Sequence, residues 1–207
     1  MVIAIDGPAG AGKSTVARAV AARLGFTYLD TGAMYRCVGL ATREQEGEPA
    51  DLAERMTIEV GERVLLDGRD VTEAIRGPGV SEAASRVAAD PGVRAALVRK
   101  QQELLAEGDW VAEGRDIGTV VAPDAAVKVF LHADPAERAR RRAAQTGRSV
   151  EEVLALQRER DLRDSSAQRS TLRPANDAVP VDTTALSLDD VIEQIVTLAV
   201  EAKEVDA

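Results

Sequence analysis

The sequence has few aromatic residues, one cysteine and one histidine, and each scarcity excludes something. Aromatic residues make up 2% of the 207 residues, so a core must be built mainly from Ala, Val, Leu and Ile. The single cysteine, Cys37, rules out an intramolecular disulfide, and we expect it to be a buried helical residue. No His/Cys grouping suggests zinc, and we interpret His132 as a residue at a strand end rather than a base.

Long apolar runs and an excess of positive charge are also missing. No apolar run approaches the roughly 20 residues that cross a bilayer. The first residues pass directly into an Asp-Gly-Pro turn, so no signal peptide is expected. The net charge of −9 argues against binding of a nucleic-acid polymer, which requires a basic footprint. We therefore expect a cytoplasmic monomer with no membrane partner that acts on small molecules.

Short apolar strands alternate with helical patterns along the chain. The predicted strands are residues 2–5, 27–29, 110–112, 127–131 and 178–181. The predicted helices are residues 13–24, 32–43, 135–144 and 150–163, with a last helix capped by Ser187. This alternation favours βαβ units, and it predicts an α/β protein with a parallel sheet of about five strands.

Residues 44–105 differ from the rest of the chain. Helical patterns at residues 51–60 and 93–105 flank a predicted hairpin that turns at Asp67-Gly68. We interpret residues 44–105 as a subdomain inserted into a core formed by residues 1–43 and 106–207.

Residues Gly7–Ser14, with the sequence GPAGAGKS, match the full Walker A pattern between an apolar strand and an amphipathic helix. The glycines allow backbone N–H groups to turn toward phosphate oxygens, beside the positive end of the helix dipole. Lys13 is expected to reach the β- and γ-phosphates, and the Ser14 hydroxyl to ligate Mg²⁺. The predicted nucleotide-binding residues are Gly7, Pro8, Ala9, Gly10, Ala11, Gly12, Lys13, Ser14 and Thr15.

Several features separate this chain from other P-loop classes. The guanine-reading Asn-Lys-x-Asp pattern is absent, and no apolar run ends in the Asp of a typical Walker B strand. Arginines instead recur around the predicted site, at Arg36, Arg115, Arg138, Arg142 and Arg160. Arg138, Arg142 and Arg160, each taken alone, could equally belong to a solvated helix face.

As a set, however, the arginines suit a reaction between two phosphorylated molecules. Arginine neutralises the charge of donor and acceptor along an in-line path. Arg138 and Arg142 are four residues apart and therefore share one helix face. We expect residues around 138–165 to form a helical lid that closes over the phosphates and excludes water.

Four segments carry a resemblance to a known family: Ile5–Ser14, Leu29–Arg36, Glu113–Val121 and Val181–Thr184. On these motifs the chain resembles the bacterial cytidylate kinases, members of the nucleoside monophosphate kinase group of P-loop proteins. The similarity covers nearly the whole chain. It implies a three-layer P-loop fold in which the insertion is a monophosphate-binding subdomain and the lid is short and helical.

The resemblance also implies roles for residues that would hold the acceptor. Arg36 and Arg115 would grip its phosphate, in a site that Thr31 and Tyr35 also line. The residues that would read the cytosine edge are Ser85, Arg94 and Asp116. This set is chemically sensible, because cytosine offers an amino donor beside two acceptors and therefore suits a carboxylate near an arginine.

Further roles follow from the same resemblance. Arg160 and Asp164 would hold the ribose and phosphate region, while Arg138 and Arg142 would attend the ATP side and the transferring phosphoryl group. Family members commonly carry an arginine three residues after the equivalent of Asp164. Here that position is Ala167, so either Arg169 replaces it or one contact is missing. Asp30 could orient magnesium through a water molecule.

The predicted reaction is in-line transfer of the γ-phosphoryl group of ATP to CMP or dCMP, giving CDP or dCDP and ADP. The cofactor is Mg²⁺ bound with ATP, and the catalytic residues are Lys13, Arg138, Arg142 and Arg160. One alternative is a kinase of the same fold with a non-nucleotide acceptor, such as dephospho-coenzyme A or shikimate. The other is a sensor that binds ATP without turnover.

Overall fold

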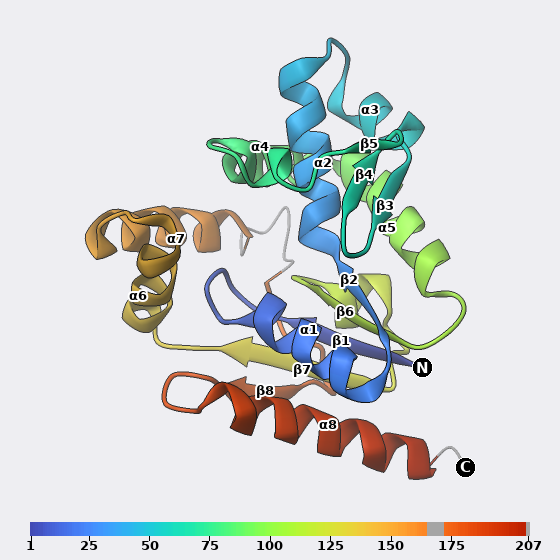
Figure 1. Ribbon diagram of the computed structural model, residues 1–207, viewed down its shortest axis with the longest axis vertical. Helices are drawn as coiled ribbons and strands as arrows, with labels where there is room; N and C mark the ends of the chain where they lie inside the picture. Colours follow the sequence, from blue (N-terminus) through green and yellow to red (C-terminus); the bar gives the residue numbers. More distant parts are fainter. Residues whose placement is uncertain (165–171, 206–207) are drawn as a thin grey trace. The chain divides into compact units, whose positions relative to one another are not determined.

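The computed structural model describes residues 1–164 and 172–205 of the chain. These residues form two compact units. The first contains Met1–Tyr28 and the described residues from Gly108 onward, and the second contains Leu29–Glu107. The helix over Thr31–Glu44 therefore groups by its contacts with the second unit. Figure 1 shows the elements of both units in chain order.

A five-stranded sheet forms the centre of the first unit. Its strands are β1 (Val2–Asp6), β2 (Thr27–Asp30), β6 (Trp110–Gly114), β7 (Val127–His132) and β8 (Val179–Asp182). The strand order is β2-β6-β1-β7-β8. Strand β1 pairs in parallel with β6 and β7, and β7 pairs in parallel with β8. The predicted α/β fold, a parallel sheet flanked by helices, is confirmed.

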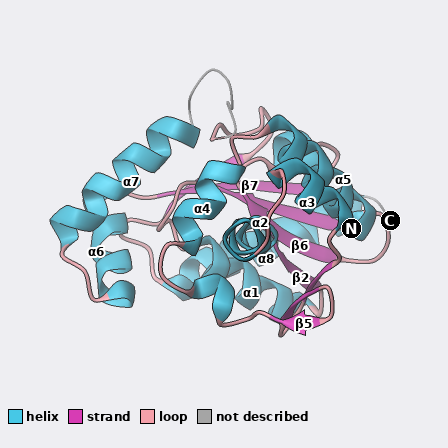
Figure 2. Cartoon of the chain, turned by 90° about the horizontal axis from the view of Figure 1, so that it is seen from above, coloured by secondary structure: helices cyan, strands magenta, loops and turns pink. Residues whose placement is uncertain are grey.

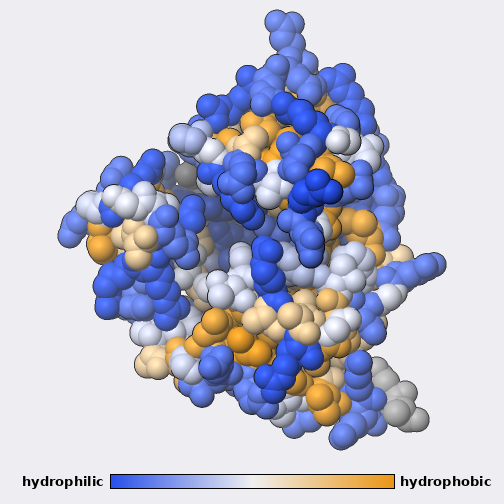
Figure 3. All heavy atoms as spheres, viewed as in Figure 1, coloured by the Kyte–Doolittle hydropathy of each residue, from blue (hydrophilic) through white to orange (hydrophobic). Residues whose placement is uncertain are grey.

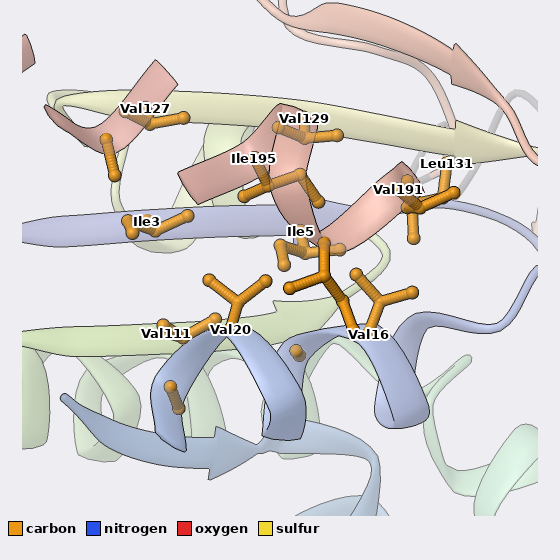
Figure 4. Close-up of a cluster of buried hydrophobic side chains, with 14 of the residues drawn as sticks. Ile3, Ile5, Val16, Val20, Val111, Val127, Val129, Leu131, Val191 and Ile195 are labelled. Atoms are coloured by element: carbon orange, nitrogen blue, oxygen red, sulfur yellow. The ribbon is translucent and has the colours of Figure 1, made fainter. Parts of the chain in front are cut away.

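Two helices, α1 (Lys13–Leu24) and α8 (Leu188–Val205), pack against each other and against the sheet. Figure 4 shows Ile3 and Ile5 of β1 facing Val16 of α1 and Ile195 of α8. This core is aliphatic apart from Phe26, as the composition predicts. None of the helices in the described part of the chain has the length and apolar composition needed to span a membrane.

Two further helices of this unit, α6 (Pro135–Thr146) and α7 (Val150–Asp164), lie side by side (Figures 1 and 2). Ala139, Ala143 and Val153 form a small core between them. Pro135 stands in the first turn of α6, and Asp134 caps this helix by accepting from the N–H groups of the next turn. Helical stop signals are also clear, since Gly147 ends α6 in the left-handed conformation.

The second unit begins with a long helix and contains a small antiparallel sheet. Its elements are α2 (Thr31–Glu44), α3 (Pro49–Arg55), β3 (Ile58–Val60), β4 (Val64–Leu66), β5 (Arg69–Asp70), a 3-10 turn η1 (Ala74–Arg76), α4 (Val80–Val87) and α5 (Pro91–Leu105). The strand order is β3-β4-β5. The predicted hairpin is confirmed, and Asp67 and Gly68 both have positive φ at its turn, as a two-residue type I′ turn requires.

Two elements of this unit, strand β3 and helix α4, differ from the prediction. The helix expected over residues 51–60 ends at Arg55, and Ile58–Val60 form strand β3. Antiparallel pairing decides the conformation, because Ile58 lies opposite Leu66 and both side chains are buried. Helix α4 was not predicted.

Candidate active site

The Gly7–Ser14 segment forms the loop between β1 and the first turn of α1. Gly12 precedes α1 with a φ of 91°, in the left-handed conformation. Gly7 has a φ of 148°, and a Cβ atom there would lie 2.0 Å from the carbonyl oxygen of Leu131. A Cβ atom on Gly10 would lie 2.9 Å from the carbonyl oxygen of Arg138. The loop therefore requires glycine where it approaches β7 and α6.

Lys13 opens α1 and donates from Nζ to the carbonyl oxygen of Pro8 at 2.9 Å. Burial, followed by the positive charge of Arg115, lowers the pKa of Lys13 from 10.5 to about 7. The negative charges of Glu113 and Asp6 act in the opposite direction. The site thus holds a lysine whose charge needs an anionic partner, which the phosphates of a nucleotide would supply.

Ser14 and Thr15 follow Lys13 and are exposed. A serine hydroxyl is a hard oxygen ligand of the kind that Mg²⁺ prefers, and Mg²⁺ in phosphoryl-transfer sites keeps several water and phosphate ligands. The exposed hydroxyl of Ser14, at the helix end that faces phosphate in P-loop proteins, fits a nucleotide-bound magnesium ion.

Asp6, the last residue of β1, is buried and binds the turn that follows β6. Its Oδ1 accepts from the backbone N–H of Ile117 at 2.9 Å, and its Oδ2 accepts from the N–H of Gly118 at 2.8 Å. These two residues begin η2 (Ile117–Val121), a single turn of π-helix. Burial raises the pKa of Asp6 from 3.8 to about 6, against the effect of the two hydrogen bonds.

Arg115 lies between the loop and α7. Its Nη1 donates to the carbonyl oxygen of Gly7 at 2.7 Å, and its Nη2 lies 3.3 Å from Oδ2 of Asp164. Arg160 is near the same carboxylate, with 3.8 Å between its Nε and Oδ2 of Asp164. Three of the predicted substrate-binding residues are therefore brought together. Asp116 follows Arg115 and is also buried.

Arg138 is buried at the junction of α6, α7 and the loop. Its Nη1 donates to the carbonyl oxygen of Ala9 at 2.9 Å, and its Nη2 lies 2.8 Å from Oδ2 of Asp161. Gln157 of α7 donates to the backbone oxygen of Arg138 at 3.4 Å. Helices α6 and α7 are thus attached to the loop through Arg138.

Arg142 has a different environment from Arg138, although both lie on α6. It is exposed, and its Nη1 donates to Gln145 at 3.1 Å. Figure 3 shows that α6 and α7 present a mainly hydrophilic surface on this face. The Arg142 side chain is therefore available to a ligand without loss of a buried contact.

Glu113 of β6 and its hydrogen-bond partner Tyr28 of β2 were not predicted to be site residues. The strand predicted over residues 110–112 stops before Glu113, but Glu113 belongs to β6 and lies opposite Ile5 of β1 in parallel register. It is buried and accepts from the Tyr28 hydroxyl at 2.6 Å. The detectable signal was the apolar run Trp110–Ala112 followed by an acid, which resembles a Walker B strand with Glu in place of Asp.

Thr183 and Arg141 were also not predicted. Thr183 is buried after β8, and its hydroxyl lies 3.3 Å from the carbonyl oxygen of Ala11 and 3.2 Å from that of His132. Arg141 of α6 donates to the Thr183 hydroxyl at 3.0 Å and to its carbonyl oxygen at 2.6 Å. The motif Val181–Thr184 was noted in the sequence, but its contact with the loop depends on the fold.

The second unit holds the remaining predicted residues. Asp30 caps α2 by accepting from the N–H of Ala33 at 2.8 Å, and its other oxygen pairs with Arg36 at 2.7 Å. Both oxygens of Asp30 therefore already have protein partners. Thr31 and Tyr35 lie on the first turns of α2, one turn apart.

The residues expected to read the base lie on three elements. Ser85 is buried in α4, and Arg94 stands in the first turns of α5, which Asp90 caps. Asp116 precedes η2 in the first unit. Ala167 and Arg169, the two candidates for the missing family arginine, lie outside the described residues.

Comparison with known proteins places this geometry in context. The family model described as cytidylate kinase matches residues 3–201. The cytidylate kinase of Solibacter usitatus is 48% identical over 212 positions, which cover 96% of this chain and 91% of that protein. The cytidylate kinase of Carboxydothermus hydrogenoformans is 48% identical, covering 96% of each chain.

Solved structures add the fold. A gluconokinase from Sinorhizobium meliloti matches with a TM-score of 0.56 and 20% identity, covering 99% of this chain and 94% of that one. A shikimate kinase from Bacteroides thetaiotaomicron matches with a TM-score of 0.51 and 19% identity, covering 99% and 98%. At these identities the likeness concerns the P-loop kinase architecture.

Proposed function

Because the chain belongs to the cytidylate kinase family and transfers the γ-phosphoryl group of ATP to CMP or dCMP, we propose that the residues gathered at the Gly7–Ser14 loop carry this transfer. The products are CDP or dCDP and ADP. The relatives do not support the alternative of a non-nucleotide acceptor. The proposal rests on the contacts of Arg115, which donates a hydrogen bond to Gly7 of the loop and forms an ion pair with Asp164 of α7.

On the donor side, residues Gly7–Thr15 hold the phosphates of ATP through backbone N–H groups at the start of α1. Lys13 gives up its hydrogen bond to Pro8 and turns to the β- and γ-phosphates. Their negative charge favours the protonated, positively charged form of the lysine. Mg²⁺ neutralises phosphate charge when bound, and the Ser14 hydroxyl would hold it. Asp30 would act on the ion only through water, since its oxygens bind Ala33 and Arg36.

On the acceptor side, Arg36 and Arg115 bind the monophosphate, in a site lined by Thr31 and Tyr35. The arginine fork suits two phosphate oxygens at once. Arg115 is already oriented by Gly7 and Asp164, so it loses little freedom when the acceptor arrives. The hydrogen bond from Arg115 to Gly7 supports a short distance between acceptor phosphate and donor loop.

The base and sugar need separate contacts. Ser85, Arg94 and Asp116 read cytosine, with Asp116 accepting from its amino group. Arg160 and Asp164 hold the ribose and phosphate region, where their mutual distance of 3.8 Å supports a shared role.

The chemical step needs charge stabilisation more than proton transfer. The attacking oxygen of CMP is already anionic at neutral pH, so no general base is required. Lys13, Arg142 and Arg160 stabilise the charge that spreads over the transferring group. Arg138 fixes the loop against α6 and α7 on the ATP side, and these helices act as the lid. We also infer a cytoplasmic monomer that uses only small-molecule substrates. Sedimentation of the purified enzyme would test the monomeric state.

A coupled ADP-release assay with magnesium and ATP tests the function. The acceptors to compare are CMP, dCMP, UMP, AMP, GMP and none. Fast turnover with CMP and dCMP alone is the expected result. Turnover that does not depend on any of the five nucleotides would overturn the acceptor assignment, and omission of magnesium would test the cofactor.

A further inference from the structure

The junction of β1 with the turn after β6 contains a buried carboxylate that the phosphoryl transfer described above does not use. Asp6 ends β1 directly before the Gly7–Ser14 loop, and it is 5% exposed. Its two oxygens each accept one backbone N–H, from Ile117 and from Gly118. A charged group in such a place costs free energy unless its hydrogen bonds are kept.

The two N–H groups belong to the first residues of η2, immediately after Asp116. The carbonyl oxygen of Asp116 itself accepts from Val120 at 2.9 Å and from Val121 at 3.2 Å. The backbone carbonyl group of Asp116 is thus fixed by hydrogen bonds from η2. The first two residues of η2 are in turn fixed by the carboxylate of Asp6. A π-turn is a rare conformation that persists only where surrounding contacts determine it.

A second contact closes the junction from the opposite direction. Arg115, the neighbour of Asp116, donates to the carbonyl oxygen of Gly7, the neighbour of Asp6. Residues 6 and 7 therefore fix residues 115–118 by three hydrogen bonds of 2.7–2.9 Å. Asp116 is thus flanked by anchored residues: the Arg115 side chain binds the first residue of the donor loop, and the backbone N–H groups of Ile117 and Gly118 bind the last residue of β1.

Only a carboxylate can make both contacts of Asp6. Each carboxylate oxygen accepts, whereas an asparagine amide would present NH₂ to one of the two N–H groups. Asparagine at residue 6 would therefore lose one hydrogen bond and place two donors against each other, while keeping the size of the side chain.

We propose that Asp6 is a positioning residue for base selectivity, because its carboxylate fixes the turn that holds Asp116 toward the cytosine of the acceptor. This inference rests on the proposed function and on the base-reading role of Asp116 within it. A carboxylate at that place accepts from the amino group of cytosine and repels the carbonyl oxygen that uracil carries instead. The ratio of kcat/KM for CMP to kcat/KM for UMP therefore depends on the position of the Asp116 carboxylate relative to the base. We call it the CMP/UMP ratio.

The test compares three variants of the full chain with the unmodified enzyme. Asp6→Asn should lower the CMP/UMP ratio about tenfold, mainly through a higher KM for CMP, since one buried N–H loses its acceptor. Asp116→Asn should lower the same ratio. Val111→Ala, which removes two methyl groups from a fully buried residue of β6, should lower the melting temperature and leave the ratio unchanged.

Each outcome decides something different. A folded Asp6→Asn enzyme with an unchanged ratio overturns the positioning role, as does an equal fall in Val111→Ala. No turnover of CMP by the unmodified enzyme would instead overturn the proposed function. An altered ratio in Asp6→Asn with none in Asp116→Asn would contradict the link to Asp116.

If Asp6→Asn does not fold, the pH dependence of the unmodified enzyme decides. Asp6 faces the charges of Asp116 and Lys13, and burial already brings its pKa to about 6. Protonation turns one accepting oxygen into a donor, so the CMP/UMP ratio should fall between pH 7.5 and 5.5. The phosphates of CMP and UMP titrate alike, so their effect on kcat/KM cancels in the ratio. The effect of Lys13 cancels as well, because Lys13 would act on ATP in both reactions. A flat ratio over this range overturns the proposal.

Discussion

The guanidinium of Arg138 in α6 forms an ion pair with the carboxylate of Asp161 in α7, with 2.8 Å between Nη2 and Oδ2. The arginine is 7% exposed, and its Nη1 also donates to Ala9 in the donor loop. One side chain therefore joins helices α6 and α7 to the loop that would hold ATP.

Removing this side chain should be costly. Arg138→Ala leaves Asp161 without its partner and Ala9 without a donor, and we expect a loss of about 2–3 kcal/mol in the free energy of unfolding. Urea denaturation followed by circular dichroism measures it. Arg140→Ala is the matched control, because Arg140 is largely exposed and pairs with Glu137 at the surface, so its loss should be within about 0.5 kcal/mol. Equal losses in the two variants would show that the buried pair adds nothing.

Removal of the Arg142 side chain should affect catalysis and not stability. Arg142 is exposed, and its side chain hydrogen-bonds Gln145 at 3.1 Å, so Arg142→Ala should leave stability unchanged. If it stabilises the transferring phosphoryl group, kcat should fall about 100-fold while the dissociation constant of ATP changes less than about threefold. Steady-state kinetics and titration with ATP measure the two quantities. An unaltered kcat would remove Arg142 from the catalytic set.

Asp6 should also give stability a specific pH dependence. Its pKa is raised from 3.8 in the unfolded chain to about 6 in the fold, so the native state binds more protons between these values. Its contribution to the free energy of unfolding is therefore fully present below pH 3.8 and is lost as pH rises through about 6. The stability difference between the unmodified enzyme and Asp6→Asn should fall by about 3 kcal/mol across this window. Urea denaturation at intervals of pH measures it, and a constant difference would contradict the raised pKa.

Local signals made much of the fold predictable. Helix α1 spans Lys13–Leu24 as predicted, because left-handed glycines at residues 12 and 25 bound a clear helical periodicity. Strand β3 was not predictable from its own residues, since three residues become a strand only by pairing with β4. The strand β6 was predicted too short, because Glu113 is polar and its burial depends on Tyr28 and on β1.

The site was predictable where one segment carries a complete motif, and less so where partners are distant in sequence. The spacing of Arg138 and Arg142 predicts a shared helix face, but it does not predict that Arg138 is buried against Ala9 while Arg142 faces solvent. The contact between Asp6 and Gly118 joins residues more than 100 positions apart. No local pattern distinguishes such a buried acid from an ordinary strand-terminal one.

The last prediction concerns the charge of Lys13. Burial lowers its pKa to about 7 in the free enzyme, so at pH 8 much of it is uncharged. Nucleotide phosphates favour the charged form, so binding of ATP should take up a fraction of a proton that rises toward one between pH 7 and 9. Calorimetric titration with ATP at pH 8 measures this uptake, as the difference in binding enthalpy between buffers of different ionisation enthalpy.

Lys13→Arg supplies the control for this experiment. Arginine stays protonated at pH 8, so the variant should take up no proton from this position, provided that it still binds ATP. A binding enthalpy of the unmodified enzyme that is equal in all buffers would show that Lys13 is already charged before ATP arrives. Burial at the base of the loop would then be offset by Glu113 and Asp6, the two acids that raise its pKa.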